Sequence, residues 1–140
     1  MNKEYAIVTD GSCDLPKELC QEKGITVVPF YVSFDGEKYE KEIVEMPIRQ
    51  FYEDMVKNPK VFPKSSMPSV QDYMDAFMPI VQAGKAIICI CITTKFSGSM
   101  QSALNARMMI LEQHPDAEIT VIDATINTVL QGIYVLEAQK

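Results

Sequence analysis

The residues whose types and spacing best suit ligand binding are the three small ones at Ser97-Gly98-Ser99. They follow a continuously apolar run, Ala86 to Ile92, and precede a segment with helical periodicity. The N–H groups at a helix start carry partial positive charge, so two hydroxyls beside them favour a site for a carboxylate or phosphate. An ordinary serine N-cap is the alternative, and it accounts for one of the two serines. The spacing matches neither a phosphate-binding P-loop nor a dinucleotide site.

A second polar cluster, Ser65-Ser66-Met67-Pro68-Ser69, precedes another helical segment. Ser69 is predicted to cap that helix, with Asp72 completing a capping box. This cap does not account for Ser65 and Ser66, which are therefore further candidates for ligand contacts.

The third cluster is Asp10-Gly11-Ser12-Cys13-Asp14, directly after a short β-branched run. Aspartyl phosphatases carry a D-x-D pair in such a loop, but the position of the second acid is Ser12 here. A calcium loop needs glycine and a distal glutamate at fixed offsets, and both are missing. We therefore expect Asp10 to order this loop, Asp14 to cap the next helix, and no metal to bind.

The clusters at Asp10 and Ser97 each follow a predicted strand. The runs Tyr5 to Thr9, Ala86 to Ile92 and Ile119 to Ile122 predict strands, and stripes of helical periodicity separate them. This alternation predicts an α/β fold, a mostly parallel sheet with helices on both faces. In such folds ligands sit beyond the carboxyl ends of the strands. The topology therefore gathers Asp10, the Ser97 cluster and Asp123 at one edge.

The rest of the chain gives weaker patterns. Alternation predicts a half-buried strand over Val28 to Phe34, closed by a turn at Asp35-Gly36. Pro47 is predicted to start a helix that Asn58 ends, and residues 60–68 to form a loop. The last helical stripe, Ile126 to Leu136, has no stop signal. This pattern allows two interpretations: a helix that ends the protein, or residues 1–140 as the first part of a longer protein.

Composition excludes several classes of function. Acidic residues outnumber basic ones 19 to 13, and the net charge of −6 predicts no binding to nucleic-acid phosphates. No run approaches the ~20 apolar residues of a membrane span, and the first residues do not form a secretory signal. The four cysteines match no disulfide framework or zinc site. We expect a cytoplasmic protein with reduced thiols.

Two other residue types carry less information. His114 is the single histidine and stands before Pro115 at a predicted helix end, so we expect it to be exposed, without a nucleophilic partner. Cys89 and Cys91 are expected on one face of a buried strand. The nine methionines are expected mostly in the core, although their flexibility also suits a pocket for a long apolar ligand.

Four motifs, in order, resemble those of the DegV family. The first resembles the family motif T-D-S-x-x-D-L and is Val8-Thr9-Asp10-Gly11-Ser12-Cys13-Asp14-Leu15. The second resembles T-S-Q-P-S and is Ser65-Ser66-Met67-Pro68-Ser69. The third resembles S-G-T-Y-Q-S-A and is Ser97-Gly98-Ser99-Met100-Gln101-Ser102-Ala103, and the fourth resembles V-I-D-S and is Val121-Ile122-Asp123-Ala124. The resemblance extends from Thr9 to Gly132, nearly the whole chain.

This resemblance implies a bacterial fatty-acid-binding protein that is not an enzyme. It implies a two-domain α/β fold with the acyl chain in the first domain and the carboxylate near the domain junction. Matched by position, the hydroxyls of Ser65 and Ser97 and the backbone N–H groups of Gly98 and Ser99 hold that carboxylate. The implied ligand is a long-chain fatty acid, with no other cofactor, and the implied partner is a fatty acid kinase that phosphorylates the bound acid.

The same resemblance sets expectations for the pocket and the domain boundary. We expect apolar walls from Phe30, Met67, Phe77 and Phe96. Met67 stands where the family motif has Gln, and Ala124 where it has Ser, so two polar groups are lost. Residues 1–140 are expected to be the N-terminal lipid-binding domain, ending before the second domain.

Two other functions compete with the fatty-acid carrier. One is a phosphatase or other phosphoryl-transfer enzyme that uses Asp10, although the second acid and a metal cluster are missing from the sequence. The other is a non-catalytic interaction domain in which every polar cluster serves only caps and turns.

Overall fold

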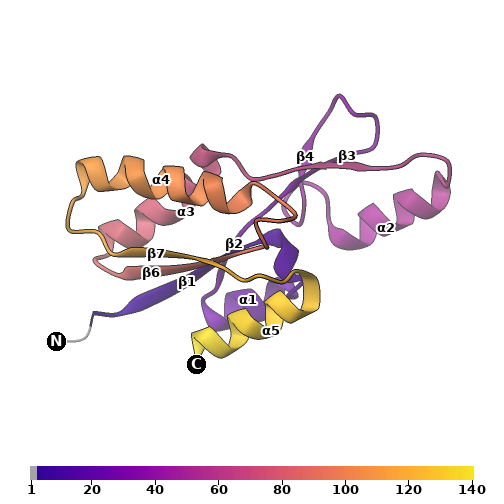
Figure 1. The fold of residues 1–140 in the computed structure, drawn as a ribbon. Helices are drawn as coiled ribbons and strands as arrows, with labels where there is room; N and C mark the ends of the chain where they lie inside the picture. The colour runs from indigo at the N-terminus through magenta and orange to yellow at the C-terminus, as the bar shows by residue number, and fades with distance from the viewer. Residues whose placement is uncertain (1–2) are drawn as a thin grey trace. The chain divides into compact units, whose positions relative to one another are not determined.

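The computed structural model describes residues 3–140, and the chain forms two compact units (Figure 1). Unit 1 contains the described residues up to Val28 together with Pro68–Lys140, and unit 2 is Pro29–Met67. No helix in residues 3–140 is long and apolar enough to cross a membrane.

Unit 1 is built on a four-stranded sheet whose strands all run parallel. Its strands are β1 (Tyr5–Asp10), β2 (Thr26–Val28), β6 (Ala86–Cys91) and β7 (Ile119–Asp123), in the order β2-β1-β6-β7. Val8 pairs with Thr26 on one side and with Cys89 on the other, and Cys89 pairs with Val121. Apolar, β-branched strand bodies suit a sheet that is covered on both faces, and the predicted parallel sheet is confirmed.

Helices cover both faces of this sheet, as predicted (Figure 1). On one face lie α3 (Val70–Gln82) and α4 (Ser99–Gln113), and on the other α1 (Lys17–Lys23) and α5 (Thr128–Gln139). Because side chains alternate along a strand, β1, β2 and β6 each contribute to two cores. The first core includes Val8, Tyr73, Phe77, Cys89, Cys91, Ala103, Ala106 and Ile110. The second includes Ile7, Cys20, Ile25, Ile90, Ala124 and Val135.

The helix boundaries in unit 1 follow local chemistry, with one error in our predictions. Gly24 ends α1 in a left-handed conformation at φ +67°, which glycine adopts without strain. Ser69 caps α3 through the predicted capping box with Asp72. The prediction that Asp14 caps α1 is wrong, because the N-cap is Pro16. Asp14 instead adopts φ +54° and closes a short 3-10 turn, η1 (Gly11–Cys13).

Unit 2 contains a three-stranded antiparallel sheet and one helix. Its strands β3 (Tyr31–Ser33), β4 (Glu40–Lys41) and β5 (Lys64–Ser66) lie in the order β4-β3-β5, and the helix is α2 (Ile48–Lys57). Phe51 of α2 packs on Phe34, with ring centroids 5.4 Å apart. Pro47 starts α2 and Asn58 ends it, as predicted.

Two predictions for unit 2 are wrong. The single strand expected over Val28 to Phe34 is two strands in different sheets, because Val28 ends β2 and Tyr31 begins β3. Pro29 lies between them, and it has no N–H with which to continue a ladder. Residues 60–68 are not only a loop, since Lys64–Ser66 forms β5 and pairs with β3.

All four cysteines are free thiols and all are buried. Cys13 and Cys20 are 2% and 4% exposed, and Cys89 and Cys91 are fully enclosed. Burial raises the pKa of the Cys13 thiol to about 12, and it also raises the pKa of Cys20 and Cys89. Cys89 and Cys91 lie on the same face of β6, as predicted, with their sulfur atoms 3.7 Å apart.

Candidate ligand-binding site

The candidate site of unit 1 lies where the connectivity of the sheet reverses. From β1 the chain goes to β2 on one side, whereas from β6 it goes to β7 on the other. The carboxyl ends of β1 and β6 are therefore neighbours, and open α/β sheets bind their ligands at such a reversal. Asp10 ends β1, and the Ser97 cluster follows β6, so the topology brings these residues together as predicted.

Asp10 is fully buried, and its carboxyl group joins four segments of unit 1. One oxygen, Oδ2, accepts hydrogen bonds from the Ile92 N–H and the Ser99 hydroxyl, each at 2.9 Å. The other, Oδ1, accepts from Gln131 Nε2 at 2.9 Å and from the Ser12 N–H at 3.3 Å. The expectation that Asp10 orders the loop is confirmed, and its contacts also reach α4 and α5.

The charge of Asp10 is stabilised by hydrogen bonds alone. Burial raises the pKa of its carboxyl group, while the bonds from Gln131, Ile92, Ser99 and Ser12 oppose this rise. All four partners are N–H or O–H donors, and within residues 3–140 we find no lysine or arginine paired with Asp10. The four donors therefore offset part of the cost of burying this acid.

The hydroxyl groups around Asp10 have a defined donor order. The Ser99 hydroxyl has one proton and donates it to Asp10. Tyr73 Oη lies 2.6 Å from Ser99 Oγ, so the Tyr73 hydroxyl is the donor in that bond. The oxygen of Tyr73 is then left to accept from the Cys91 thiol, whose sulfur lies 3.6 Å away. Three side chains thus donate in sequence toward one carboxylate.

Ser97 is arranged differently from Ser99. It is half-buried, and its Oγ accepts the Ser99 N–H at 3.1 Å. Because the oxygen is an acceptor in this bond, its own O–H remains available for another group. The N-cap of α4 is Gly98, which is exposed and has no side-chain cap. Neither serine is therefore the N-cap residue, but the Ser97 oxygen accepts the first N–H of α4, as a capping group does.

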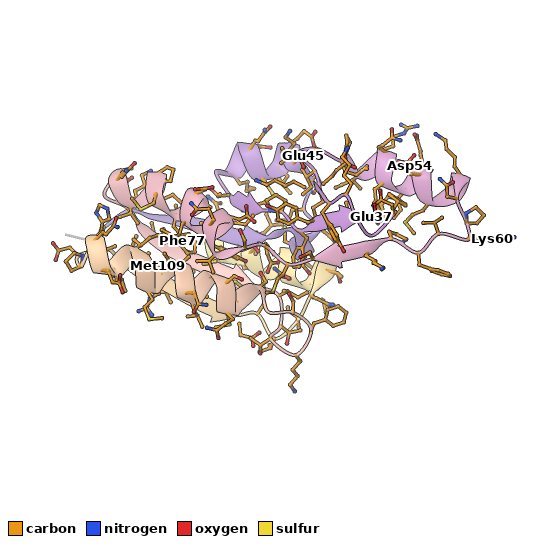
Figure 2. The ribbon with its side chains drawn as sticks, turned by 90° about the horizontal axis from the view of Figure 1, so that it is seen from above. Glu37, Glu45, Asp54, Lys60, Phe77 and Met109 are labelled. Carbon is orange, nitrogen blue, oxygen red and sulfur yellow. The ribbon has the colours of Figure 1, made fainter. Side chains whose placement is uncertain are left out.

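Ser99 has no donor left over in this structure. Its hydroxyl is used by Asp10 and its N–H by Ser97, although the family resemblance placed that N–H on the ligand. Phe96, beside Ser97, is 75% exposed. Phe77 lies on α3 (Figure 2). It is fully enclosed and packs against Tyr73, with ring centroids 5.6 Å apart. Unit 1 therefore presents Ser97, Gly98 and Phe96 at the surface, and Ser99 and Phe77 inside.

The remaining predicted residues belong to unit 2. Ser65 is exposed on β5 and pairs with Val32 of β3. Met67, at the end of unit 2, is 47% exposed, and Phe30 is half-buried. Unit 2 thus carries one hydroxyl and two apolar side chains of the predicted set.

Sequence patterns missed Gln131 and the role of Tyr73. Gln131 is fully buried on α5, and its Nε2 also donates to Thr9 Oγ1 at 3.1 Å. Its own oxygen, Oε1, has no partner within residues 3–140. A glutamine on the inner side of an apolar helix was the available signal, because such a residue is buried only when another group satisfies it. Tyr73 looked like one more member of an apolar stripe.

The opposite edge of the sheet holds a surface cavity of about 330 Å³. Its walls include Lys3, Lys85 and His114, near the amino ends of β1, β6 and β7. His114 is half-buried there, whereas we expected it to be exposed. This cavity lies at the other end of the strands from Asp10, so it is separate from the candidate site.

The geometry of Asp10 bears on the phosphoryl-transfer alternative. A nucleophilic carboxylate needs an oxygen that can reach its substrate, but Asp10 is enclosed and both of its oxygens accept hydrogen bonds. In the described part of the chain, no three His, Cys, Asp or Glu residues are placed to share a metal ion. Asp10 therefore has the surroundings of a structural acid.

Comparison with known proteins identifies the family to which this chain belongs. The model of the DegV family, described as an uncharacterised protein family, matches residues 4–140. A DegV domain-containing protein of Clostridium perfringens is 32% identical over 134 residues, which are 96% of this chain and 46% of that protein. A DegV domain-containing protein of Caldanaerobacter subterraneus is 34% identical over 138 residues, 99% of this chain and 47% of that protein.

Solved structures agree with these relatives. The crystal structure of a stearic-acid-binding protein from Eubacterium ventriosum is 46% identical with a TM-score of 0.93, covering 96% of this chain and 46% of that one. DegV of Bacillus subtilis, described as a fatty-acid-binding protein, is 28% identical with a TM-score of 0.84, covering 99% of this chain and 47% of that one. The chain spans about half the length of the relatives it matches. Because the family match extends over residues 4–140, the chain belongs to the DegV family.

Proposed function

We propose that this chain is a DegV lipid-binding domain that holds the carboxylate of a long-chain fatty acid. The observation that carries the proposal is the Ser97 hydroxyl, which has its oxygen engaged and its proton available beside the start of α4. Gly98 offers a backbone N–H at the same point, and the family resemblance adds the hydroxyl of Ser65 to the proposal. The description of the Eubacterium ventriosum protein as stearic-acid-binding supports the ligand class.

Head group and tail contribute differently to such binding. Hydrogen bonds to a charged carboxylate contribute about 1.5–3 kcal/mol each, and the helix start adds favourable electrostatics. Each acyl CH₂ that is buried contributes about 0.8 kcal/mol, so the tail supplies most of the affinity. In unit 1, Phe96 is available for such contacts, whereas Phe77 is already enclosed. Phe30 and Met67 are the corresponding candidates of unit 2.

The proposed role is binding without catalysis. Asp10 is the one acid at the candidate edge that suggested phosphoryl transfer, and the hydrogen bonds that enclose it support a structural role. The resemblance to the family adds a partner to the proposal, a fatty acid kinase that receives the bound acid. In this scheme the kinase supplies all phosphoryl-transfer groups.

Native mass spectrometry of the purified chain, with solvent extraction of bound lipid, tests the proposal. The chain is measured alone and fused to the part of the Eubacterium ventriosum relative that it does not match. We expect close to one long-chain fatty acid per protein, a lower occupancy in Ser97→Ala, and no change in His114→Ala at the opposite edge. A folded fusion that retains no fatty acid, or equal retention by Ser97→Ala, would contradict the proposal.

A further inference from the structure

One oxygen of Asp10 holds both ends of the loop that carries Ser97. Oδ2 accepts from the Ile92 N–H, directly after β6, and from the Ser99 hydroxyl, at the first residue of α4. Residues 93–98 span the distance between these two bonds. The separation of the loop ends is therefore fixed by a single acceptor atom, and that atom belongs to the neighbouring strand β1.

Ser99 connects this acceptor to Ser97. Its hydroxyl donates to Asp10 while its N–H donates to Ser97 Oγ. The first bond fixes where the backbone of Ser99 lies, and the second uses that backbone to occupy the oxygen of Ser97. A hydroxyl that accepts the Ser99 N–H directs its own proton away from that N–H, so the proton is free for another acceptor. The orientation of the Ser97 hydroxyl thus depends on Asp10 through one intermediate residue.

Tyr73 keeps the Ser99 hydroxyl directed at Asp10. Tyr73 donates to Ser99 Oγ at 2.6 Å, so the proton of Ser99 has Asp10 as its acceptor. Tyr73 is fully buried and packs on Phe77, which fixes the ring within the core of unit 1. The position of the hydroxyl is therefore set by core packing.

We propose that Asp10, Ser99 and Tyr73 are positioning residues that hold loop 93–98 so that Ser97 presents its O–H to the ligand carboxylate. This inference rests on the proposed function and assigns roles within the same site. The hydroxyl of Ser99 acts on the ligand through Ser97, and Asp10 and Tyr73 act through Ser99. None of the three hydroxyl or carboxyl groups contacts the ligand.

Two probes separate positioning from a general structural role. Stearic acid has the charged head group, and methyl stearate has the same tail with an uncharged ester. Hydrogen bonds to an ionised group are roughly twice as strong as neutral ones. Loss of the correct Ser97 orientation therefore lowers the affinity for stearic acid more than the affinity for methyl stearate. General damage to the pocket lowers both affinities equally.

The test is calorimetry with both probes on whichever form, the chain or the fusion, retains fatty acid. We expect Ser99→Ala to weaken stearic acid binding roughly two- to tenfold, the range of one hydrogen bond, with a smaller change for methyl stearate. Tyr73→Phe changes binding in the same direction. Ser99→Thr, which keeps the hydroxyl, restores the affinity. Ser99→Ala added to Ser97→Ala has little further effect, because both act through the same donor.

The outcomes distinguish this inference from the proposed function. If neither form binds stearic acid before any substitution, the proposed function fails and this inference fails with it. If the unaltered protein binds, equal losses for both probes, or additive effects of Ser97→Ala and Ser99→Ala, overturn the inference alone. Circular dichroism of each variant verifies folding, and Ser99→Thr provides the folded comparison if Ser99→Ala is unstable.

Discussion

The packing of α5 on the 3-10 turn η1 predicts that Gly132→Ala destabilises the protein. A Cβ atom at Gly132 would lie 2.4 Å from the backbone oxygen of Cys13 and 3.0 Å from Leu15 Cδ2. The oxygen belongs to the backbone of a turn, so it cannot rotate away as a flexible side chain does. Reaching ordinary contact requires the two segments to separate by about 1 Å.

The expected change in the free energy of unfolding of Gly132→Ala has three contributions. Overpacking of this kind costs typically 1–3 kcal/mol. Displacement of α5 also weakens the bond that the adjacent Gln131 donates to Asp10, and bonds to charged groups contribute about 1.5–3 kcal/mol. The better helix propensity of alanine offsets about 1 kcal/mol. We expect the free energy of unfolding to fall by about 2 kcal/mol.

Urea unfolding followed by circular dichroism measures this change. With a denaturant slope near 2 kcal/mol/M, the midpoint falls by about 1 M. Val129→Ala, at an exposed position of the same helix, is the control and is expected to change stability by less than about 0.5 kcal/mol. A Gly132→Ala variant as stable as the parent protein would refute the argument that α5 and η1 are packed this closely.

Three further predictions concern the site. Burial raises the pKa of Asp10 above its ordinary value of 3.8, so its contribution to stability is full below that value and is lost as pH rises through the raised pKa. The stability of the parent protein relative to Asp10→Asn should therefore fall with rising pH in urea titrations, and a constant or rising difference would contradict the described burial. Tyr73→Phe should lower the free energy of unfolding by about 1 kcal/mol, because Ser99 Oγ loses its donor; unchanged unfolding would count against that bond. Ser97→Ala should weaken stearic acid binding by about 0.5–3 kcal/mol and His114→Ala should not, as calorimetry would show; equal affinities would remove Ser97 from the site.

The predictable part of the fold is the part whose signals are local. Strand β6 is enclosed by helices on both faces, so its sequence is apolar throughout, and α3 begins with a capping box that four consecutive residues define. Strand β5 has three exposed residues and is held by pairing with β3, which lies about thirty residues earlier. No pattern within such a segment indicates its partner. The error at Asp14 arises from the preceding turn, because Asp14 closes η1 at φ +54° and α1 begins only after Pro16.

In the candidate site, too, local features were predictable from the sequence and contacts between distant elements were not. Ser97-Gly98-Ser99 follows a buried strand and precedes a helix, and neighbouring residues were enough to predict this position. The different use of the two hydroxyls was not predictable, because it depends on which side chains reach Ser99 from other elements. Tyr73 comes from α3 and Gln131 from α5, and helical periodicity indicates only which face of each helix is inward. Contacts between elements decide which polar side chain meets Asp10.

Because all four thiols are buried, their reaction with an added reagent can be used to measure local unfolding of the protein. Alkylating reagents react with thiolates, and here reagent access is blocked while the raised pKa of Cys13, Cys20 and Cys89 keeps the thiolate scarce. The rate of labelling in native buffer therefore records how often each segment opens. Cys20 reports on α1, Cys13 on the turn beneath α5, and the pair on β6 on the centre of the sheet. Mass spectrometry of peptides from partly labelled protein would thus rank these regions by local stability, without any added probe.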